Sequence, residues 1–196
     1  MHILYVLLVT FFAGMGAGLG TGFAGMSAAA VISPMLITFL GMDPYMAVGI
    51  ALSSDILASA VSAYTYHKNQ NLDVKNGLIM MASVLGFTVV GSWLASLVPS
   101  QTMGGFSVFM TFLLGIKFIV KPVMTTKEAM QGISAKKRAI QSIVCGVIIG
   151  LICGFVGAGG GMMMLLILTS VLGYELKTAV GTSVFIMTFT ALTGAV

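Results

Sequence analysis

Asp55 is the only acidic residue inside an apolar stretch long enough to cross a membrane, residues 44–66. It lies eleven residues from each end of that stretch, so about 16 Å of helix separates it from either membrane surface. A charge at such depth is costly and marks a candidate for function. Ser59 and Ser62 follow on the same helix face. Two roles stay open for Asp55: a proton-coupling group, protonated when an anionic substrate is bound, or a hydrogen-bonded structural acid.

Two glycine-rich segments, GTGFAGMS (residues 20–27) and CGFVGAGGG (residues 153–161), interrupt apolar stretches of only 11–19 residues. A break inside the bilayer frees backbone N–H and C=O groups and is tolerated only where protein or a water-filled cavity covers it. Helices that restart at Ser27 and near Gly159 would direct their N-termini inward, and such ends bind anions. We therefore predict that these segments supply substrate-binding residues: Gly22, Phe23, Gly25, Ser27, Gly154, Phe155, Gly157, Gly159, Gly160 and Gly161.

Hydroxyl side chains in the last apolar stretch complete the predicted site. Thr182 and Ser183 could donate neutral hydrogen bonds to an oxyanion, although bonding between helices is the commoner use of such residues. Glycines at a spacing of four, Gly14-xxx-Gly18-xxx-Gly22 and the corresponding series from Gly146 to Gly154, form seams that are typical of close helix packing.

Catalytic and metal-binding constellations are missing from the sequence. The two histidines, His2 and His67, lie at the ends of apolar stretches, and Cys145 and Cys153 form no CxxC pair. No HExxH or GxSxG motif occurs. We expect no enzymatic activity, no cofactor and no metal.

The composition explains where these residues must act. The chain of 196 residues is 58% hydrophobic and 7% charged, whereas globular domains carry roughly 25% charged residues. This composition excludes a soluble enzyme, a disordered tail and a nucleic-acid-binding module. The expected partners are the lipid bilayer and a small anionic substrate.

Eight apolar stretches and the basic residues between them predict a multi-pass protein of the plasma (inner) membrane. The stretches are residues 2–20, 28–40, 44–66, 77–98, 102–120, 139–152, 162–172 and 178–196. Two loops separated by two spans lie on one side of the membrane, and their basic residues predict that this side is cytoplasmic. These residues are Lys68 and Lys75 in one loop and Lys117, Lys121, Lys127, Lys136, Lys137 and Arg138 in or beside the other.

An internal repeat relates the two glycine-rich segments. An offset of 132 positions lays residues 14–49 on residues 146–181 and aligns six pairs of glycines, where about 0.6 would arise by chance. Three ordinary spans lie between the two breaks. If each broken segment is a hairpin that returns to its own side, the second copy is inverted and its turn GYELK is cytoplasmic. A single broken helix that crosses the membrane would place GYELK outside.

The predicted fold is therefore an all-α polytopic membrane protein with two inverted repeats, each starting with a broken, re-entrant helix hairpin. The first repeat covers residues 1–120 and contains the broken pair and three spans. Residues 121–138 form a cytoplasmic basic loop. The second repeat, residues 139–196, is incomplete and contains its broken pair and one span.

The motifs GFAGMSAAAVISPMLITFLGMDP and GFVGAGGGMMMLLILTSVLGYELKTAVGTS resemble the two repeats of the sulfite exporter TauE/SafE family, the toluene sulfonate uptake permeases. The resemblance covers nearly the whole chain. It implies a polytopic plasma-membrane transporter of small sulfur-containing or organic anions, with the helix breaks building the substrate site. Family and repeat both predict two further spans, so we expect either a fragment, which we favour, or a homodimer whose partner supplies the missing wall.

Together these observations predict a secondary transporter of small anions, similar to sulfite or organosulfonates, with coupling to protons as one of the two roles left open for Asp55. Two alternatives stay open. One is a passive anion channel, and the other is a non-transporting membrane scaffold or accessory subunit.

Overall fold

The computed structural model describes residues 2–95, 97, 116, 120, 135–156 and 160–194, and these residues contain helices and no strand. The helices are α1 (His2–Ala24), α2 (Ala29–Leu40), α3 (Pro44–Lys68), α4 (Val74–Ala95), α7 (Ala135–Val156), α8 (Gly160–Ser170) and α9 (Leu176–Gly194). Within the described part of the chain, four segments are long and apolar enough to cross a membrane, namely Ile3–Ala24, Met46–Lys68, Val74–Gly91 and Leu176–Thr193. The predicted all-helical, polytopic architecture is confirmed. Most of the predicted span 102–120 and of the basic loop lies outside the described residues.

Polar and apolar side chains are distributed as expected for a protein surrounded by lipid. Large apolar residues such as Leu57 and Val61 are exposed on the outer faces of the helices, whereas Asp55 and Ser59 on the same helix are buried. Two buried apolar clusters hold the helices together. One joins α1, α2 and α3, and the other joins α4, α7, α8 and α9 together with Ala63 of α3.

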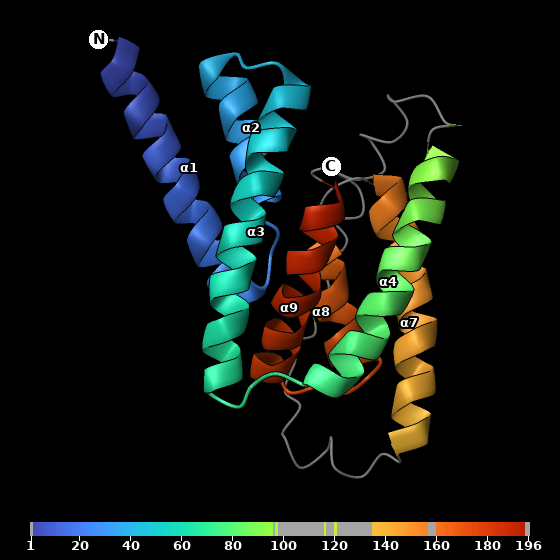
Figure 1. Cartoon of the computed structure of the whole chain (residues 1–196). Helices are drawn as coiled ribbons and strands as arrows, with labels where there is room; N and C mark the ends of the chain where they lie inside the picture. Colours follow the sequence, from blue (N-terminus) through green and yellow to red (C-terminus); the bar gives the residue numbers. More distant parts are fainter. Residues whose placement is uncertain are drawn as a thin grey trace.

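Helix α9 lies at the centre of the arrangement (Figure 1). It packs against α3 on one side and against α4 and α8 on the other, while α4 also packs along α7. Ser59 of α3 accepts a hydrogen bond from Thr188 of α9, and Tyr66 of α3 contacts Gly181 of α9. Because the residue number rises along α3 as it falls along α9, the two helices are antiparallel.

Helix bounds recur at the offset of 132 residues. Helix α1 ends at Ala24 and α7 at Val156, and α3 begins at Pro44 and α9 at Leu176. The turns before α3 and α9 each contain a glycine with positive φ, Gly41 and Gly173. The corresponding helices α3 and α9 run in opposite directions, as the inverted arrangement requires. A duplication as the origin of the two halves stays a prediction from the sequence.

One end of the molecule, which we call the lysine end, is where α3 finishes and α4, α7 and α9 begin (Figure 1). Lys68, Lys75, Lys136 and Lys177 lie in the helix turns at this end. The turn GYELK is therefore at the same end as the α3–α4 link, as predicted for a hairpin that returns to its own side.

The first chain break is shorter than its sequence suggested. We expected an interruption over residues 20–27, but α1 stays helical to Ala24 and only residues 25–28 leave the helix. Glycine weakens a helix by roughly 1 kcal/mol in water. In lipid an unpaired backbone group costs several times more, so the helix continues wherever its geometry allows. Similarly, α7 begins at Ala135, inside the predicted basic loop.

The two glycine seams differ in what they contact. A Cβ on Gly146 would lie 2.9 Å from the carbonyl oxygen of Met80, and one on Gly150 would lie 2.6 Å from that of Val84, so α7 and α4 meet backbone to backbone. Gly14 and Gly18 have no atom within 4 Å of a Cβ. Close packing of the seam on α1 is therefore not seen among the described residues.

Candidate functional site

Asp55 lies at the middle of α3 and is only 1% exposed. Its carboxylate accepts two hydrogen bonds from the first chain break, one from the Ser27 hydroxyl to Oδ2 (2.6 Å) and one from the Ala28 backbone N–H to Oδ1 (2.8 Å). Both donors precede the first residue of α2. The only acid of a described span therefore sits at the N-terminus of α2, where a helix attracts negative charge.

The first break pairs its own backbone amides. Ala29 donates to the Ser27 hydroxyl (3.3 Å) and Ala30 to the Ser27 carbonyl (3.1 Å), while Gly25 donates to Thr21 of α1. We expected these amides to be free for an anionic substrate. In this conformation the amides of residues 25, 26 and 28–30 donate to the carboxylate of Asp55 or to the chain itself, so an external anion would have to replace Asp55 at the end of α2.

The first chain break touches the start of α8. A Cβ on Gly161, in the first turn of α8, would collide with the carbonyl oxygen of Gly25 and would lie 3.2 Å from the Ser27 nitrogen. A Cβ on Gly25 would lie 2.6 Å from the Ser183 hydroxyl of α9. Gly25 also has φ +59°, a conformation that favours glycine. We call Gly25, Ser27, Asp55, Gly161 and Ser183 the break junction.

Met187 of α9 occupies the position that corresponds to Asp55 by the offset of 132. Its sulfur is among the atoms that a Cβ on Gly161 would collide with, so it lies at the start of α8 as Asp55 lies at the start of α2. A thioether carries no charge and is only a weak acceptor. The two helix starts are therefore geometrically similar and electrostatically different.

A cavity of about 730 Å³ lies at the lysine end between α1, α3 and α9. Its inner part reaches Gly22 and Val180, and Val180 contacts Gly25 of the break junction. Tyr66 donates a hydrogen bond from its hydroxyl to the Gly22 carbonyl (2.8 Å) across this region. The cavity is lined by Gly22, Phe23, Val61, Ser62, Thr65, Tyr66, Asn69, Asn71, Leu176, Lys177 and Val180.

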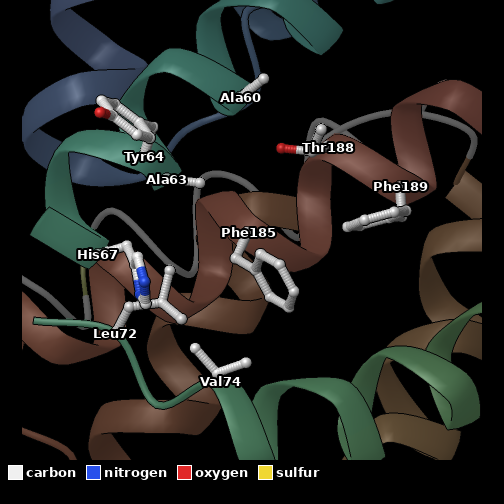
Figure 2. Close-up of a pocket in the computed structure, with 9 residues that line it drawn as sticks. All are labelled: Ala60, Ala63, Tyr64, His67, Leu72, Val74, Phe185, Thr188 and Phe189. Atoms are coloured by element: carbon white, nitrogen blue, oxygen red, sulfur yellow. The ribbon is translucent and has the colours of Figure 1, made fainter.

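A second cavity, of about 380 Å³, lies on the other side of α3 and α9. Phe185 and Phe189 of α9 lie across from side chains of α3 and of the α3–α4 link (Figure 2). Its lining is almost entirely apolar, with His67 and the Thr188 and Tyr64 hydroxyls as exceptions. Such a lining does not suit a small hydrated anion, because the anion would lose its water without gaining donors.

The structure brings together some of the predicted site residues. Gly25, Ser27, Gly161 and Ser183 meet at the break junction with Asp55, and Gly22 and Phe23 line the larger cavity. Phe23 is 79% exposed, so it covers the cavity from outside and is not part of the junction.

Other predicted residues lie elsewhere. The Thr182 hydroxyl accepts a hydrogen bond from the Asp73 N–H of the α3–α4 link (3.2 Å). Gly154 faces Gly91 of α4, and Gly160 lies against Cys153 of α7. Gly157, Gly159 and the side chain of Phe155 lie outside what the structure describes.

Sequence reasoning missed the polar residues of the larger cavity. Neither Tyr66 nor Lys177 was among the residues predicted for the site. The sequence did contain a signal for two of these residues, because Ser62 and Tyr66 continue the polar face of α3 that begins at Asp55. Nothing in the sequence indicated that the start of α9 would approach that face.

Comparison with known proteins identifies relatives along nearly the whole chain. Residues 10–196 match the family model described as "Sulfite exporter TauE/SafE". Two proteins of Bacillus subtilis (strain 168) are similar to the chain. "Probable membrane transporter protein YdhB" is 24% identical over 183 residues, which are 91% of this chain and 73% of that protein. "Probable membrane transporter protein YunE" is 26% identical over 192 residues, 91% of this chain and 70% of that protein. No solved structure matches the chain.

Proposed function

Because the chain belongs to the sulfite exporter TauE/SafE family, and is thus a multi-pass membrane transporter, we propose that it carries small anions of the sulfite or organosulfonate class by proton-coupled secondary transport. Family membership also supports a role without enzymatic catalysis. We further propose that the protein lies in the plasma membrane with its lysine end in the cytoplasm, since lysines gather on the cytoplasmic side of membrane proteins.

The observation that carries the proposal is the break junction. The first chain break meets the start of α8, which is distant in the sequence, beside Asp55, the one buried acid among the described residues, at the middle of α3. Broken helices that meet at the bilayer midplane are typical of substrate sites in secondary transporters. Backbone contact between Gly25 and Gly161 also means that a movement of one half changes the surroundings of the other.

Asp55 links proton binding to anion binding in this proposal. Ionised, the carboxylate is itself the anion at the start of α2 and excludes another by repulsion and by occupying the donors. Protonated, it loses its charge, and the end of α2 becomes attractive to a substrate anion. Substrate and proton therefore bind together, and the rate of uptake rises as the pH on the loading side falls. The described hydrogen-bond donors to the Asp55 carboxylate, the Ser27 hydroxyl and the Ala28 N–H, are uncharged.

The test is flux into proteoliposomes with sulfite, thiosulfate and methanesulfonate, with and without an imposed pH gradient. Methanesulfonate stays singly charged across the pH range, so its pH profile reports the protein and not the substrate. We expect accumulation against a gradient when the inside is alkaline. Accumulation of none of these anions would contradict the proposed substrate class, and flux that never exceeds equilibration would indicate a channel.

Asp55→Asn tests the coupling in the same vesicles. The amide is always neutral, so methanesulfonate uptake should become independent of pH and should no longer be driven by the pH gradient. Ser59→Ala is the matched control. Its hydroxyl bonds the Asp55 backbone carbonyl and not the carboxylate, so the pH profile should remain. An unchanged profile in Asp55→Asn would refute the coupling and leave anion transport intact.

A further inference from the structure

We propose that the 730 Å³ cavity at the lysine end is an anion-binding vestibule, in which Lys177, Ser62 and Asn71 hold a small oxyanion before it reaches the break junction. The inference rests on the proposed anion transport and names a second site on the substrate path. It is distinct from the junction, where Asp55 occupies the donors.

The lining of the cavity suits an anion. It includes one cation, Lys177, and several uncharged polar side chains, while no acidic residue is among the lining residues that the structure describes. The hydroxyls of Thr65 and Tyr66 donate to backbone carbonyls, and the Asn69 amide donates to the Thr65 carbonyl. Ser62 and Asn71 are the lining side chains for which no such internal bond is seen.

The acidic residues nearest to the cavity in sequence, Asp73 and Glu175, are not among its described lining residues. Asp73, in the α3–α4 link, accepts hydrogen bonds from the Tyr174 hydroxyl (2.8 Å) and from the Asn76 side chain (2.7 Å). Lys177 is therefore the one formal charge among the described lining residues. Its ammonium is a compact point charge that suits an oxyanion of any shape.

The cavity leads towards the junction. Gly22 and Val180 belong to its lining, and Val180 packs against Gly25. Between vestibule and junction lies the hydrogen bond from Tyr66 to the Gly22 carbonyl, which ties α3 to the last turn of α1. An anion in the vestibule is thus one helix turn from the first break, and its way onward passes the Tyr66 bond.

Charge-selective labelling tests the vestibule without requiring transport. In Ser62→Cys, the rates of modification by an anionic (sulfonatoethyl) and a cationic (trimethylammonioethyl) methanethiosulfonate are compared, with the parent chain as a blank for Cys145 and Cys153. We expect the anionic reagent to modify the thiol faster than the cationic one. This preference should fall about fivefold in Ser62→Cys/Lys177→Gln. Methanesulfonate should slow the modification by protecting the thiol. Lys75→Gln removes a charge at the same end but outside the cavity and should leave the preference unchanged. Asn71→Cys repeats the measurement if Ser62→Cys does not fold.

Flux measurements separate this inference from the proposed function. Lys177→Gln should raise the apparent KM for methanesulfonate about fivefold when it is supplied at the lysine end, and Lys177→Arg should restore it. Equal rates for the two reagents, or a preference that survives Lys177→Gln, would overturn the vestibule even if transport is found. Selective labelling and protection in a protein that transports none of the anions would uphold the vestibule and refute the transport.

Discussion

Asp55 illustrates what can be predicted at the scale of single residues. Its depth and its importance follow from its position in an apolar stretch, because a buried charge needs a reason. Its partners do not follow, since Ser27 and Ala28 lie 28 and 27 positions away and their approach depends on how the α1–α2 hairpin packs on α3. Some of the residues predicted for an anion site do lie together, but the carboxylate of Asp55 already occupies the N-terminus of α2.

Gly25→Ala should destabilise the protein and reduce transport. An added Cβ would strain the residue at φ +59°, at a cost of roughly 1–2 kcal/mol, and would lie 2.6 Å from the Ser183 hydroxyl. Gly14→Ala is the matched control, because Gly14 is helical, lies outside the cavity lining and has no atom within 4 Å of its Cβ position. Thermal unfolding in detergent and methanesulfonate flux provide the measurements. Equal stability of the two variants would contradict the contact between Gly25 and α9.

At the scale of helices, local sequence ended two helices too early. Composition ended the first helix at residue 20 and the helix before the second glycine-rich segment at residue 152, whereas the structure carries α1 to Ala24 and α7 to Val156. The glycine seams show what local spacing does not predict, which is whether a neighbouring helix packs on them. Gly18 and Gly150 have the same local spacing, yet only Gly150 is packed, because contact depends on which helix lies alongside. The spacing of glycines indicates that another helix can pack closely against this face. It does not indicate that one does.

Gly150→Ala and Gly18→Ala form a pair that tests this difference. In Gly150→Ala the Cβ would lie 2.6 Å from the Val84 carbonyl oxygen and 2.9 Å from the Phe87 Cβ, so α4 and α7 must separate, and we expect a loss of about 1–3 kcal/mol. Gly18→Ala meets no atom within 4 Å and should gain up to about 1 kcal/mol from helix propensity. Denaturant unfolding in one detergent compares them. Destabilisation in Gly18→Ala would show that the seam on α1 is also packed.

At the scale of the whole molecule, the inverted direction of α3 and α9 was predicted from the number of spans between the breaks. Single-cysteine labelling in right-side-out membrane vesicles checks it. Asn69→Cys and Lys177→Cys should be modified from the same side, because both residues line the cavity at the lysine end, and Asp43→Cys from the other. Modification of Lys177→Cys from the side of Asp43→Cys would instead support a broken helix that crosses the membrane.

The general architecture was predictable because lipid imposes strong rules on sequence. Few charges, long apolar stretches and basic loops determine the class, the spans and the relative sides of the loops. The larger cavity was not predictable. It forms where the ends of α1 and α3 meet the beginning of α9, and its polar residues, such as Asn71 and Lys177, lie at helix ends where the pattern of the sequence carries little information.

The exchange of Asp55 for Met187 between the two halves has a kinetic consequence. A carrier whose halves were identical as well as inverted would have inward- and outward-open forms of equal energy, and would work equally well in either direction. Here one half stores a titratable charge at its helix start and the other a neutral sulfur. If the proposed transport proceeds by exchange of the two halves, one resting orientation is favoured, and we expect the turnover rates of import and export under equal and opposite driving forces to differ.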